Sequence, residues 1–367
     1  MKIGILTFHR AYNYGAVLQC YALQQVLTAM GHKVMVIDYR QPWIEEGYKA
    51  FSWSTLAKRQ GLHMKLRYLR WAPKRWWNNE RLQKPHFRGF CKHYLNLTKP
   101  CTADTIPADF DCYIIGSDQL WNMGCTANKP DKVYFGLFDY PQQSFLVGYA
   151  IGAHPHSLAQ LGSDYLTEAV GKFRYLSFRE PSIAEQMARM TGRAFDSCID
   201  PTLLTDAAMW HNLTNDKYST RQYILAYGVR KPAGRPNYLR QKADEMARLT
   251  GWEVIDVSNM QLSVPDFLSL FRHARYVLAM SFHAVAFSLI FRRPFYAICL
   301  NDGHDERYAN LLRMIGADKQ LVSLDFTPEP LPLDYKPIVD KLNEYRKLSI
   351  KFLHNALTDP HNPNHHA

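Results

Sequence analysis

The stretch RYVLAMSFHAVAFSLIFRRPFYAICL, residues 275–300, has two short apolar runs on either side of a longer one. RYVLAM (275–280) and PFYAICL (294–300) have the length and composition of buried strands. The run between them places apolar residues at helical spacing behind Ser281, which predicts a helix over 282–292 capped by that serine. Strand, helix and strand in this order predict parallel strands joined by a crossover helix.

The same alternation extends along the rest of the chain. Strands are predicted at 2–8, 33–39, 112–116, 145–152, 174–178, 222–229 and 253–258, and helices at 15–31, 157–172, 181–191, 236–250, 264–273, 304–316 and 336–356. A polar stretch near 212–220 separates two such sets. We therefore expect an α/β fold with two Rossmann-like domains, 1–214 and 215–367, and a cleft between them. A helical insertion interrupts the first domain at about 44–100.

Composition and length indicate a globular protein of two domains. The chain has 367 residues, of which 47% are hydrophobic and 21% are charged. No run of 18 apolar residues occurs, and the start turns polar after eight residues, so neither a membrane span nor a secretory signal is expected. The seven cysteines form no C-x-x-C pair, so we expect reduced thiols and a cytoplasmic location.

The net charge of +11 is concentrated in one segment. Residues 58–92 contain eleven Lys and Arg against Glu80 alone, together with Trp71, Trp76 and Trp77. Such a segment could lie on the anionic inner face of a membrane or hold a phosphorylated substrate. A solvated helical hairpin that packs its apolar face on the domain is the other interpretation. Nucleic acid is not an expected partner, because no binding motif accompanies the charge.

Polar side chains follow several predicted strands, at the sheet edge where ligands of open parallel sheets gather. In HRAYNYG (9–15), Asn13 and Gly15 lead into a helix whose first N–H groups could hold an anion or a sugar oxygen. The segment is not G-x-G-x-x-G, so a nicotinamide cofactor is not expected. In GSDQLWN (116–122), Ser117 and Asp118 could bind a sugar hydroxyl, or Asp118 could cap the next turn.

Two further strand ends carry a cation and a titratable group. In SFREPS, Arg179 stands beside a helix start, where it could bind a carboxylate or phosphate, or pair with Glu180. In SFHA, His283 falls in the first turn of a helix and could donate a proton, although a lone histidine in an apolar run is often a core residue. The triplet DFD (109–111) precedes a strand at the opposite edge, so a structural role is expected and no metal site is predicted.

Five segments together resemble the polysaccharide pyruvyl transferase family. They are ILTFHRAYNYGAVLQCYAL (5–23), DCYIIGSDQLWN (111–122), LSFREPS (176–182), CIDPTLL (198–204) and SFHAVAFSLIFRRPF (281–295). The resemblance runs from about residue 2 to about residue 322. It implies a GT-B-type arrangement of the two domains and metal-independent transfer of a pyruvyl group from phosphoenolpyruvate to a glycan sugar, in capsule, exopolysaccharide or cell-wall assembly. Phosphoenolpyruvate is a donor substrate, and no cofactor is implied.

This resemblance suggests a role for each candidate residue. His283 would be the general acid, and Arg179 would bind the donor carboxylate or phosphate. The anion site would be completed by Ser281, the helix start at Phe282 and, less directly, Arg307. The acceptor sugar would meet Asn13, Gly15, Ser117 and Asp118. The chain departs from the family pattern at Met280 and at Ala284-Val285, where many members have Asp and Gly-Thr, and Ser281 stands where others have an Arg.

Two other functions are compatible with the same fold. One is a glycosyltransferase that uses a nucleotide sugar and binds its phosphates at a helix start. The other is a non-catalytic protein that binds carbohydrate or membrane through the basic segment. The sequence does not specify the acceptor sugar or the hydroxyls that react. It also does not specify whether the product is a ketal or an enol-pyruvyl ether, or what the oligomeric state is.

Overall fold

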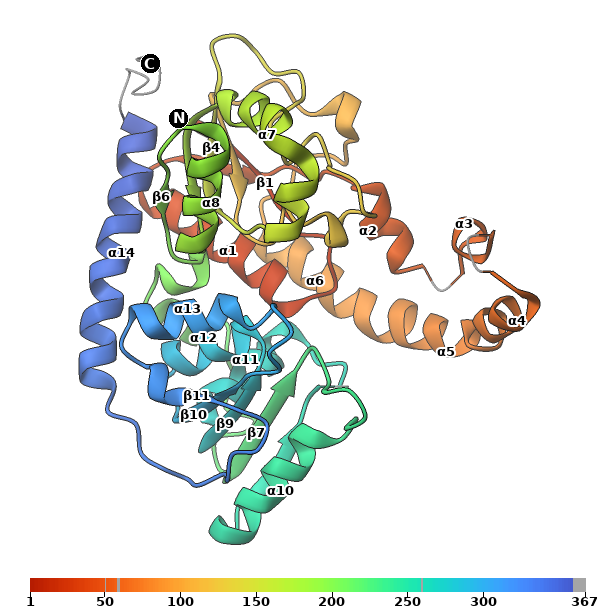
Figure 1. The fold of residues 1–367 in the computed structure, drawn as a ribbon, viewed down its shortest axis with the longest axis vertical. Helices are drawn as coiled ribbons and strands as arrows, with labels where there is room; N and C mark the ends of the chain where they lie inside the picture. The colour runs from red at the N-terminus through yellow and green to blue at the C-terminus, as the bar shows by residue number, and fades with distance from the viewer. Residues whose placement is uncertain (50, 58–59, 259, 359–367) are drawn as a thin grey trace. The chain divides into compact units, whose positions relative to one another are not determined.

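Two compact units make up the chain in the computed structural model (Figure 1). Unit 1 comprises Met1–Pro201 together with the chain from Lys351 onward, and unit 2 comprises Thr202–Ile350. The structure describes residues 1–49, 51–57, 60–258 and 260–358. Each unit contains one parallel sheet, which confirms the prediction of two Rossmann-like α/β halves.

The division between the units differs from the predicted boundary at residue 214 in two respects. Residues 202–214 belong to unit 2, where Arg346 Nε donates a hydrogen bond to the carbonyl oxygen of Leu203 at 2.6 Å. The last helix ends in unit 1, where the ring of Phe352 packs against a tyrosine ring at a centroid distance of 6.2 Å. Both differences arise from contacts between segments far apart in the chain, which a local pattern does not contain.

The sheet of unit 1 has six parallel strands in the order β2-β1-β3-β4-β5-β6. Its strands are β1 (Lys2–Leu6), β2 (Lys33–Val36), β3 (Cys112–Gly116), β4 (Phe145–Ile151), β5 (Phe173–Phe178) and β6 (Asp196–Ser197). Every residue of β3 is buried, as is typical of a strand in a sheet that is covered on both faces. Apart from β6, which has two residues, all of these strands were predicted.

Helices connect these strands and cover the sheet. They include α1 (Tyr14–Ala29), α7 (Pro155–Gly171) and α8 (Pro181–Thr191). The crossover from β1 to β2 runs in the opposite direction to the crossovers that join β4, β5 and β6. Because such crossovers are right-handed, α1 lies on one face of the sheet and α7 and α8 lie on the other.

The predicted insertion is helical and extends away from the sheet of unit 1 (Figure 1). It contains α2 (Pro42–Gly47), α3 (Trp53–Ala57), α4 (Leu62–Arg70), α5 (Ala72–Trp76), a π-helical segment (Trp77–Gln83) and α6 (Lys84–Tyr94). Pro73 and Pro85 lie in the first turns of α5 and α6, and the helical run from Ala72 to Tyr94 is continuous through the π-helical segment between them. We call residues 53–94 the basic arm; its residues 58 and 59 lie outside the described residues.

The sheet of unit 2 has five parallel strands in the order β11-β10-β9-β7-β8. They are β7 (Tyr223–Gly228), β8 (Glu253–Asp256), β9 (Tyr276–Met280), β10 (Phe295–Ile298) and β11 (Leu321–Val322). The helices of this half are α9 (Ala207–His211), α10 (Tyr238–Thr250), α11 (Val264–His273), α12 (Phe282–Ile290), α13 (Glu306–Met314) and α14 (Tyr335–Thr358), the last of which ends in unit 1. Short 3-10 turns lie at Ala103–Thr105, Met123–Cys125, Pro201–Leu203 and Asp318–Gln320. None of the described helices is both long and apolar enough to span a membrane.

Both sheets reverse their strand order at a corresponding place. In unit 1 the chain adds β2 on one side of β1 and then β3 on the other side, and in unit 2 it adds β8 and β9 around β7 in the same way. Ligands of open parallel sheets gather at the carboxyl ends of the strands beside such a reversal. The ends of β1 and β3, and those of β7 and β9, are therefore the candidate sites of the two units.

Candidate active site

Arg179 lies at the carboxyl end of β5 and is enclosed within unit 1. Its side chain is 3% exposed; Nε donates to Glu180 Oε1 at 3.1 Å and Nη1 donates to Asp200 Oδ2 at 2.9 Å. Burial by itself would lower the pKa of the guanidinium, but the negative charges of Glu180, Asp200 and Asp118 outweigh it and raise that pKa. Of the two roles that the sequence left open, these contacts favour the ion pair with Glu180 over a charge presented to a ligand.

A buried polar network around Ser117 joins the ends of β1, β3 and β4. Ser117 is fully buried, its Oγ donates to the carbonyl oxygen of Ala150 at 3.0 Å, and its N–H donates to Gln19 Oε1 at 3.2 Å. Gln19 Nε2 donates to Thr7 Oγ1 at 2.8 Å, and that hydroxyl donates to the carbonyl oxygen of Ser117 at 3.1 Å. The bonds form a closed set inside the unit, so an acceptor sugar would have to compete with them for Ser117.

The other residues predicted to meet the acceptor lie at the edge of this network. Asp118 is half-buried, and its Oδ1 accepts from the N–H of the next residue, Gln119, at 2.8 Å. Asn13 is exposed, and its Oδ1 accepts from the N–H of Ala16 at 3.2 Å; Gly15 is buried in the first turn of α1. The Nε2 of Gln119 is buried and has no hydrogen-bond partner within the described residues, which adds Gln119 to the candidates.

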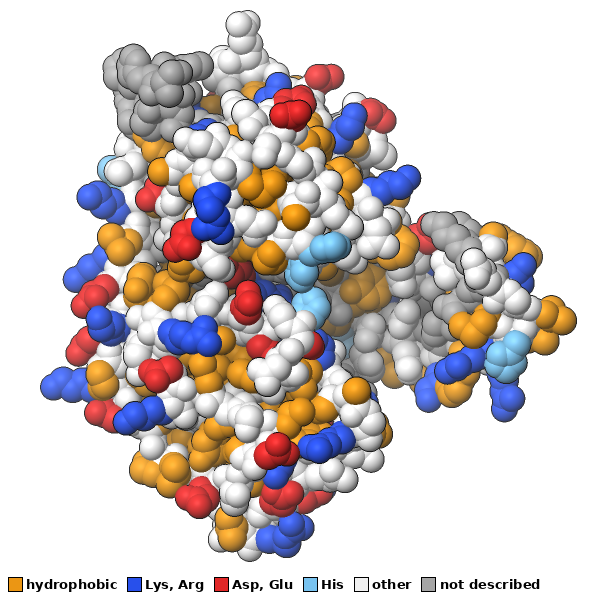
Figure 2. Space-filling view, viewed as in Figure 1, with side chains coloured by type: hydrophobic (Ala, Val, Ile, Leu, Met, Phe, Trp, Pro, Cys, Tyr) orange, Lys and Arg blue, Asp and Glu red, His pale blue; other side chains and the backbone are white. Residues whose placement is uncertain are grey.

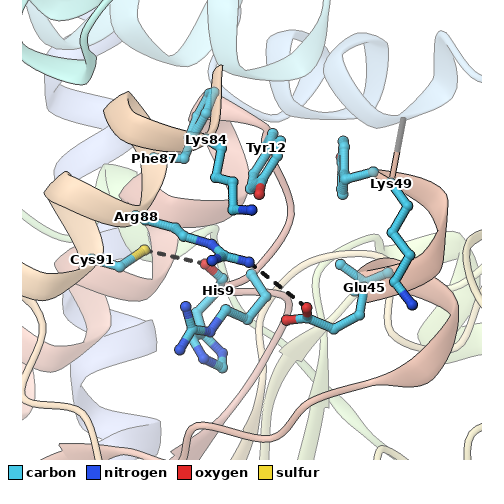
Figure 3. Close-up of a pocket in the computed structure, with 11 residues that line it drawn as sticks. His9, Tyr12, Glu45, Lys49, Lys84, Phe87, Arg88 and Cys91 are labelled. Atoms are coloured by element: carbon cyan, nitrogen blue, oxygen red, sulfur yellow. Dashed lines mark hydrogen bonds and ion pairs between the residues drawn. The ribbon is translucent and has the colours of Figure 1, made fainter. Parts of the chain in front are cut away.

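A second charged cluster lies just beyond β2, where Asp38 meets His9 and Arg10 of the segment HRAYNYG. The side chain of Asp38 is 3% exposed and accepts from Arg10 Nε at 2.6 Å, while His9 Nε2 lies 3.0 Å from the same carboxylate oxygen. Burial would raise the pKa of Asp38, but hydrogen bonds from His9 and Arg10 hold it well below its usual value. Arg10 is thereby fixed in the wall of a cavity of about 200 Å³ (Figure 3).

In unit 2 the structure places Ser281 and His283 where the sequence predicted them. Ser281 is the N-cap of α12, and its Oγ accepts from the N–H of Ala284 at 3.1 Å. His283 is the second residue of this helix, so the imidazole stands directly after the carboxyl end of β9, beside β7. It is half-buried, whereas Phe282 and the residues of α12 that follow it are buried. The histidine is therefore at the margin of the core and not within it.

Two arginines lie on the same sheet edge as His283. Arg307 is half-exposed in the first turn of α13, after β10. Arg230 follows β7, where it donates from Nη2 to Asp305 Oδ1 at 2.5 Å and pairs with Asp302. Burial would lower the pKa of Arg230, but its bonds to Asp305 and Asp302 raise it. Because β7, β9 and β10 are parallel neighbours, their ends bring these cations and the start of α12 to one edge.

The described residues contain no group of three or more His, Cys, Asp or Glu side chains placed to hold a metal ion. The DFD triplet has the structural role expected of it: Asp111 Oδ2 accepts from the backbone N–H of Lys2 at 2.6 Å, and Asp109 pairs with the Lys2 ammonium group. Both contacts fasten the amino end of β1, away from the edge where ligands gather.

The model of one protein family, polysaccharide pyruvyl transferase, matches residues 13–299. This chain belongs to the polysaccharide pyruvyl transferase family. The matched range contains His283, Arg179 and the carboxyl ends of β3, β7 and β9, and it covers most of the chain. The resemblance drawn from the five sequence segments is thus confirmed at the level of the family, which is one of transferases.

Solved structures resemble the chain only distantly. A putative UDP-N-acetylglucosamine 2-epimerase from Listeria monocytogenes is 10% identical, with 97% of this chain and 90% of that chain covered and a TM-score of 0.42. The glycosyltransferase SnogD from Streptomyces nogalater is also 10% identical, with 97% and 99% covered and a TM-score of 0.38. No curated protein matches the chain. These scores are too low to support any statement about activity.

Four residues in these sites were not identified from the sequence. Asp200 lies in the quoted segment CIDPTLL, and Gln119 lies in GSDQLWN, so both were within reach of a search for polar residues after strands. Arg230 follows β7 in the same manner. Asp38 follows β2 in the same manner, but its pairing with His9 and Arg10 of the loop after β1 depends on the sheet, which brings the two strand ends together.

Proposed function

We propose that the protein transfers the pyruvyl group of phosphoenolpyruvate to two hydroxyls of a sugar in a surface polysaccharide or its lipid-linked precursor, with His283 as the general acid. Membership of the family supports the reaction class. The observation that carries the role of His283 is its place in the first turn of α12, half-buried at the strand reversal of unit 2. Histidine suits this role because its ordinary pKa, about 6.5, lets it hold and release a proton near neutral pH.

The proposed reaction begins when the imidazolium of His283 protonates the methylene carbon of phosphoenolpyruvate. The former C=C pair forms the new C–H bond, and C2 becomes an oxocarbenium centre that one sugar hydroxyl attacks. That hydroxyl gives up its proton, which restores the acid. Cleavage of the bond between C2 and the phosphate oxygen releases inorganic phosphate and a second oxocarbenium centre. The second hydroxyl attacks it, loses its proton to phosphate, and closes the ketal.

The donor carries a carboxylate and a phosphate, so its site needs several hydrogen-bond donors or positive charges. The start of α12 supplies backbone N–H groups at its positive end, where Phe282 begins the helix and Ser281 fixes it. Arg307 adds a guanidinium group on the same sheet edge, beside Arg230, which is 19% exposed although it pairs with Asp302 and Asp305. We assign Arg179 a positioning role in unit 1, since Glu180 and Asp200 already compensate its charge. No cofactor enters this scheme, and a chelator such as EDTA should leave the rate unchanged.

On the acceptor side, we propose that Asp118 and Asn13 contact sugar hydroxyls, since both lie at the surface edge of the unit 1 network. Gln119 joins them through its buried amide nitrogen. Ser117 supports this edge from inside through its bond to Ala150. Carboxylate and amide groups of this kind orient hydroxyls by accepting and donating hydrogen bonds.

The central test compares His283→Ala with His156→Ala. His156 is a matched control because it is likewise the second residue of a helix, α7, and it is exposed. Phosphate release from phosphoenolpyruvate and formation of an acid-labile ketal would be measured with a sugar acceptor. We expect His283→Ala to lower kcat by about 10²–10⁴-fold and His156→Ala to leave it unchanged. Normal pyruvyl transfer by His283→Ala would refute the assignment, and release of a nucleotide from a nucleotide sugar would indicate a glycosyltransferase instead.

We further propose that the basic arm contacts an anionic membrane surface. In α4 only Tyr68 is buried, while Leu62, Leu66 and Leu69 are 74%, 56% and 43% exposed. Large apolar side chains and basic side chains lie together over this arm (Figure 2). Four tryptophans of the arm are exposed as well: Trp53, Trp71, Trp76 and Trp77. Tryptophan prefers the membrane interface, and each Lys or Arg near an anionic surface contributes about 1 kcal/mol to binding.

Flotation with vesicles of phosphatidylcholine and phosphatidylserine tests this contact. We expect the protein to float with the vesicles at low salt and less at high salt, because salt screens the charges. Leu66→Asp should weaken flotation, whereas Leu249→Asp, which changes a leucine that is 65% exposed on α10, should not. Failure to float at either salt concentration would contradict the proposal and would favour the other interpretation, a solvated helical hairpin that packs its apolar face on the domain.

A further inference from the structure

A cavity beside Arg10 lies in unit 1, and none of its lining residues has been given a role in the proposed reaction. It has a volume of about 200 Å³ and is lined by the loop after β1, by α2 with the residues that follow it, and by α6 (Figure 3). Pockets for drug-sized ligands hold about 300–1,000 Å³. The cavity therefore suits a small headgroup and not a whole nucleotide. All of its lining residues belong to unit 1; they are His9, Arg10, Tyr12, Ile44, Glu45, Tyr48, Lys49, Lys84, Phe87, Arg88 and Cys91.

The charge of the lining is strongly positive. Four Lys and Arg side chains face the cavity and Glu45 is the single carboxylate among the lining residues. Nη2 of Arg88 lies 3.9 Å from Oε2 of Glu45, and this distance is longer than a hydrogen bond. In Figure 3 the ends of Lys84, Arg88 and Tyr12 point into the same space. Two cations that converge in this way on a concave surface favour an anion with several oxygens.

Aromatic rings form the remaining wall of the cavity. The ring of Tyr12 is stacked on that of Phe87 at 5.7 Å and 8°, and it lies 4.3 Å from that of Tyr48. Burial is the main cause that raises the pKa of Tyr48 to about 12, so its hydroxyl keeps its proton at neutral pH. A flat aromatic surface beside a cluster of cations can pack against the apolar face of a sugar ring while the cations hold its phosphate.

The floor of this cavity is held rigidly. Arg10 is 13% exposed and is bound to Asp38 through two nitrogens, and the Sγ of Cys91 lies 3.3 Å from the carbonyl oxygen of His9. Burial raises the pKa of Cys91 to about 12, so this thiol stays neutral. Lys84 and Arg88 come from the amino-terminal half of α6, which directly follows the π-helical segment of the basic arm. A phosphate bound here would lie at the carboxyl end of β1, beside the edge that carries Asp118.

We propose that this cavity binds the phosphate of a phosphorylated sugar, with Lys84 and Arg88 on the phosphate and Tyr12 against the ring. In the setting of the proposed function, on which this inference rests, the phosphorylated sugar is the acceptor. The phosphate is then an anchor that stays intact during the reaction, and the hydroxyls that receive the pyruvyl group lie elsewhere on the glycan. Such an anchor would make the enzyme prefer phosphorylated acceptors over free sugars.

Calorimetric titration of the full-length protein with glucose 1-phosphate, without phosphoenolpyruvate, tests the cavity alone. We expect Arg88→Ala to weaken binding by about tenfold or more, because it removes a charged hydrogen-bond donor. Lys92→Ala removes the same charge from an exposed position of α6 outside the cavity and should change binding less than twofold. Glucose should bind at least tenfold more weakly than glucose 1-phosphate. Circular dichroism would show that each variant is folded.

Two further experiments test the ring contact and the lipid carrier separately. Tyr12→Ala should weaken glucose 1-phosphate but not inorganic phosphate, which lacks a ring. Phosphatidylcholine vesicles with and without polyprenyl diphosphate test the same chemistry on a lipid carrier, and Arg88→Ala should weaken binding there as well. Absence of glucose 1-phosphate binding, or equal losses in Arg88→Ala and Lys92→Ala, would overturn the proposal. Because no donor is present, failure of pyruvyl transfer would leave this result unaffected.

Discussion

The two units have the same strand reversal and use it in opposite ways. At the end of β3 in unit 1, Ser117 and Gln19 are buried within hydrogen bonds that join three strands. At the end of β9 in unit 2, Ser281 makes a single capping bond and leaves His283 half-buried at the edge. The difference shows that a polar residue after a parallel strand is only a candidate for a binding or catalytic role. The burial of that residue and its hydrogen-bond partners decide whether it stabilises the fold or is presented to a ligand.

The ion pairs of the two units differ in the same sense. Arg179 and Asp200 in unit 1 are 3% and 0% exposed, whereas Arg230 and Asp302 in unit 2 are 19% and 38% exposed. A buried charge that loses its partner is costly, because water cannot replace it. An exposed one is solvated instead. We therefore expect substitutions in unit 1 to affect stability first and those in unit 2 to affect catalysis first.

The largest effect on this comparison is expected from the glycines that end β3 and β7. Gly116 has a φ of 135°, and a Cβ there would lie 2.0 Å from the carbonyl oxygen of Tyr149. For Gly116→Ala the strained φ costs about 1–3 kcal/mol, and the clash with a backbone atom adds about as much again. At Gly228 a Cβ would lie 3.1 Å from the Cβ of Met280 without a positive φ to add strain, so Gly228→Ala should cost only the overpacking, about 1–3 kcal/mol. Urea unfolding measures both, and equal losses would remove the distinction.

A second test compares the two ion pairs directly. Asp200→Asn leaves Arg179 buried with half of its compensating charge, and we expect the free energy of unfolding to fall by about 3–5 kcal/mol. Asp302→Asn acts on a partly exposed pair and should lower it by no more than about 1 kcal/mol. Thermal unfolding of both variants at pH 7 gives the comparison. A larger loss for Asp302→Asn would show that exposure does not rank these pairs.

Arg307 tests whether unit 2 binds the donor. Arg307→Ala should raise the KM for phosphoenolpyruvate about tenfold with little change in kcat, because the lost contact holds the anion in ground and transition states alike. Arg313→Ala removes an exposed arginine from the last turn of the same helix and serves as the control. Steady-state kinetics with varied donor measures both. An unchanged KM in Arg307→Ala would mean that groups other than Arg307 bind the anion of the donor.

The last test concerns the acid sensitivity of unit 1. Hydrogen bonds from His9 and Arg10 hold the pKa of Asp38 below its value in the unfolded chain, about 3.9. Its contribution to stability is therefore present above about pH 4 and is lost as the pH falls further, when the unfolded chain takes up the proton first. Asp38→Asn should be less stable than the wild type at pH 7 and should lose less stability between pH 4 and pH 2. Thermal unfolding across this range would show parallel curves if Asp38 played no such part.

The element pattern followed from the sequence to a large extent. Buried strands such as β3, β7 and β9 are continuous apolar runs, and the Ser281 cap was correctly placed because an N-cap is a local interaction. The basic insertion was also recognised, but its individual helices, the helix α9 and the two-residue strands β6 and β11 were not. These elements are short, so a local pattern contains few residues by which to identify them.

The sequence by itself determined the two parallel-sheet halves, the family and the position of His283 after a strand. Only the tertiary structure decided that Arg179 is enclosed by Glu180 and Asp200, and that Lys84 and Arg88 face Tyr12 across a cavity. The physical reason is the range of the interactions involved. Strand burial, helix spacing and capping act over a few residues, whereas the charge and solvation of a side chain depend on neighbours brought by distant segments of the chain.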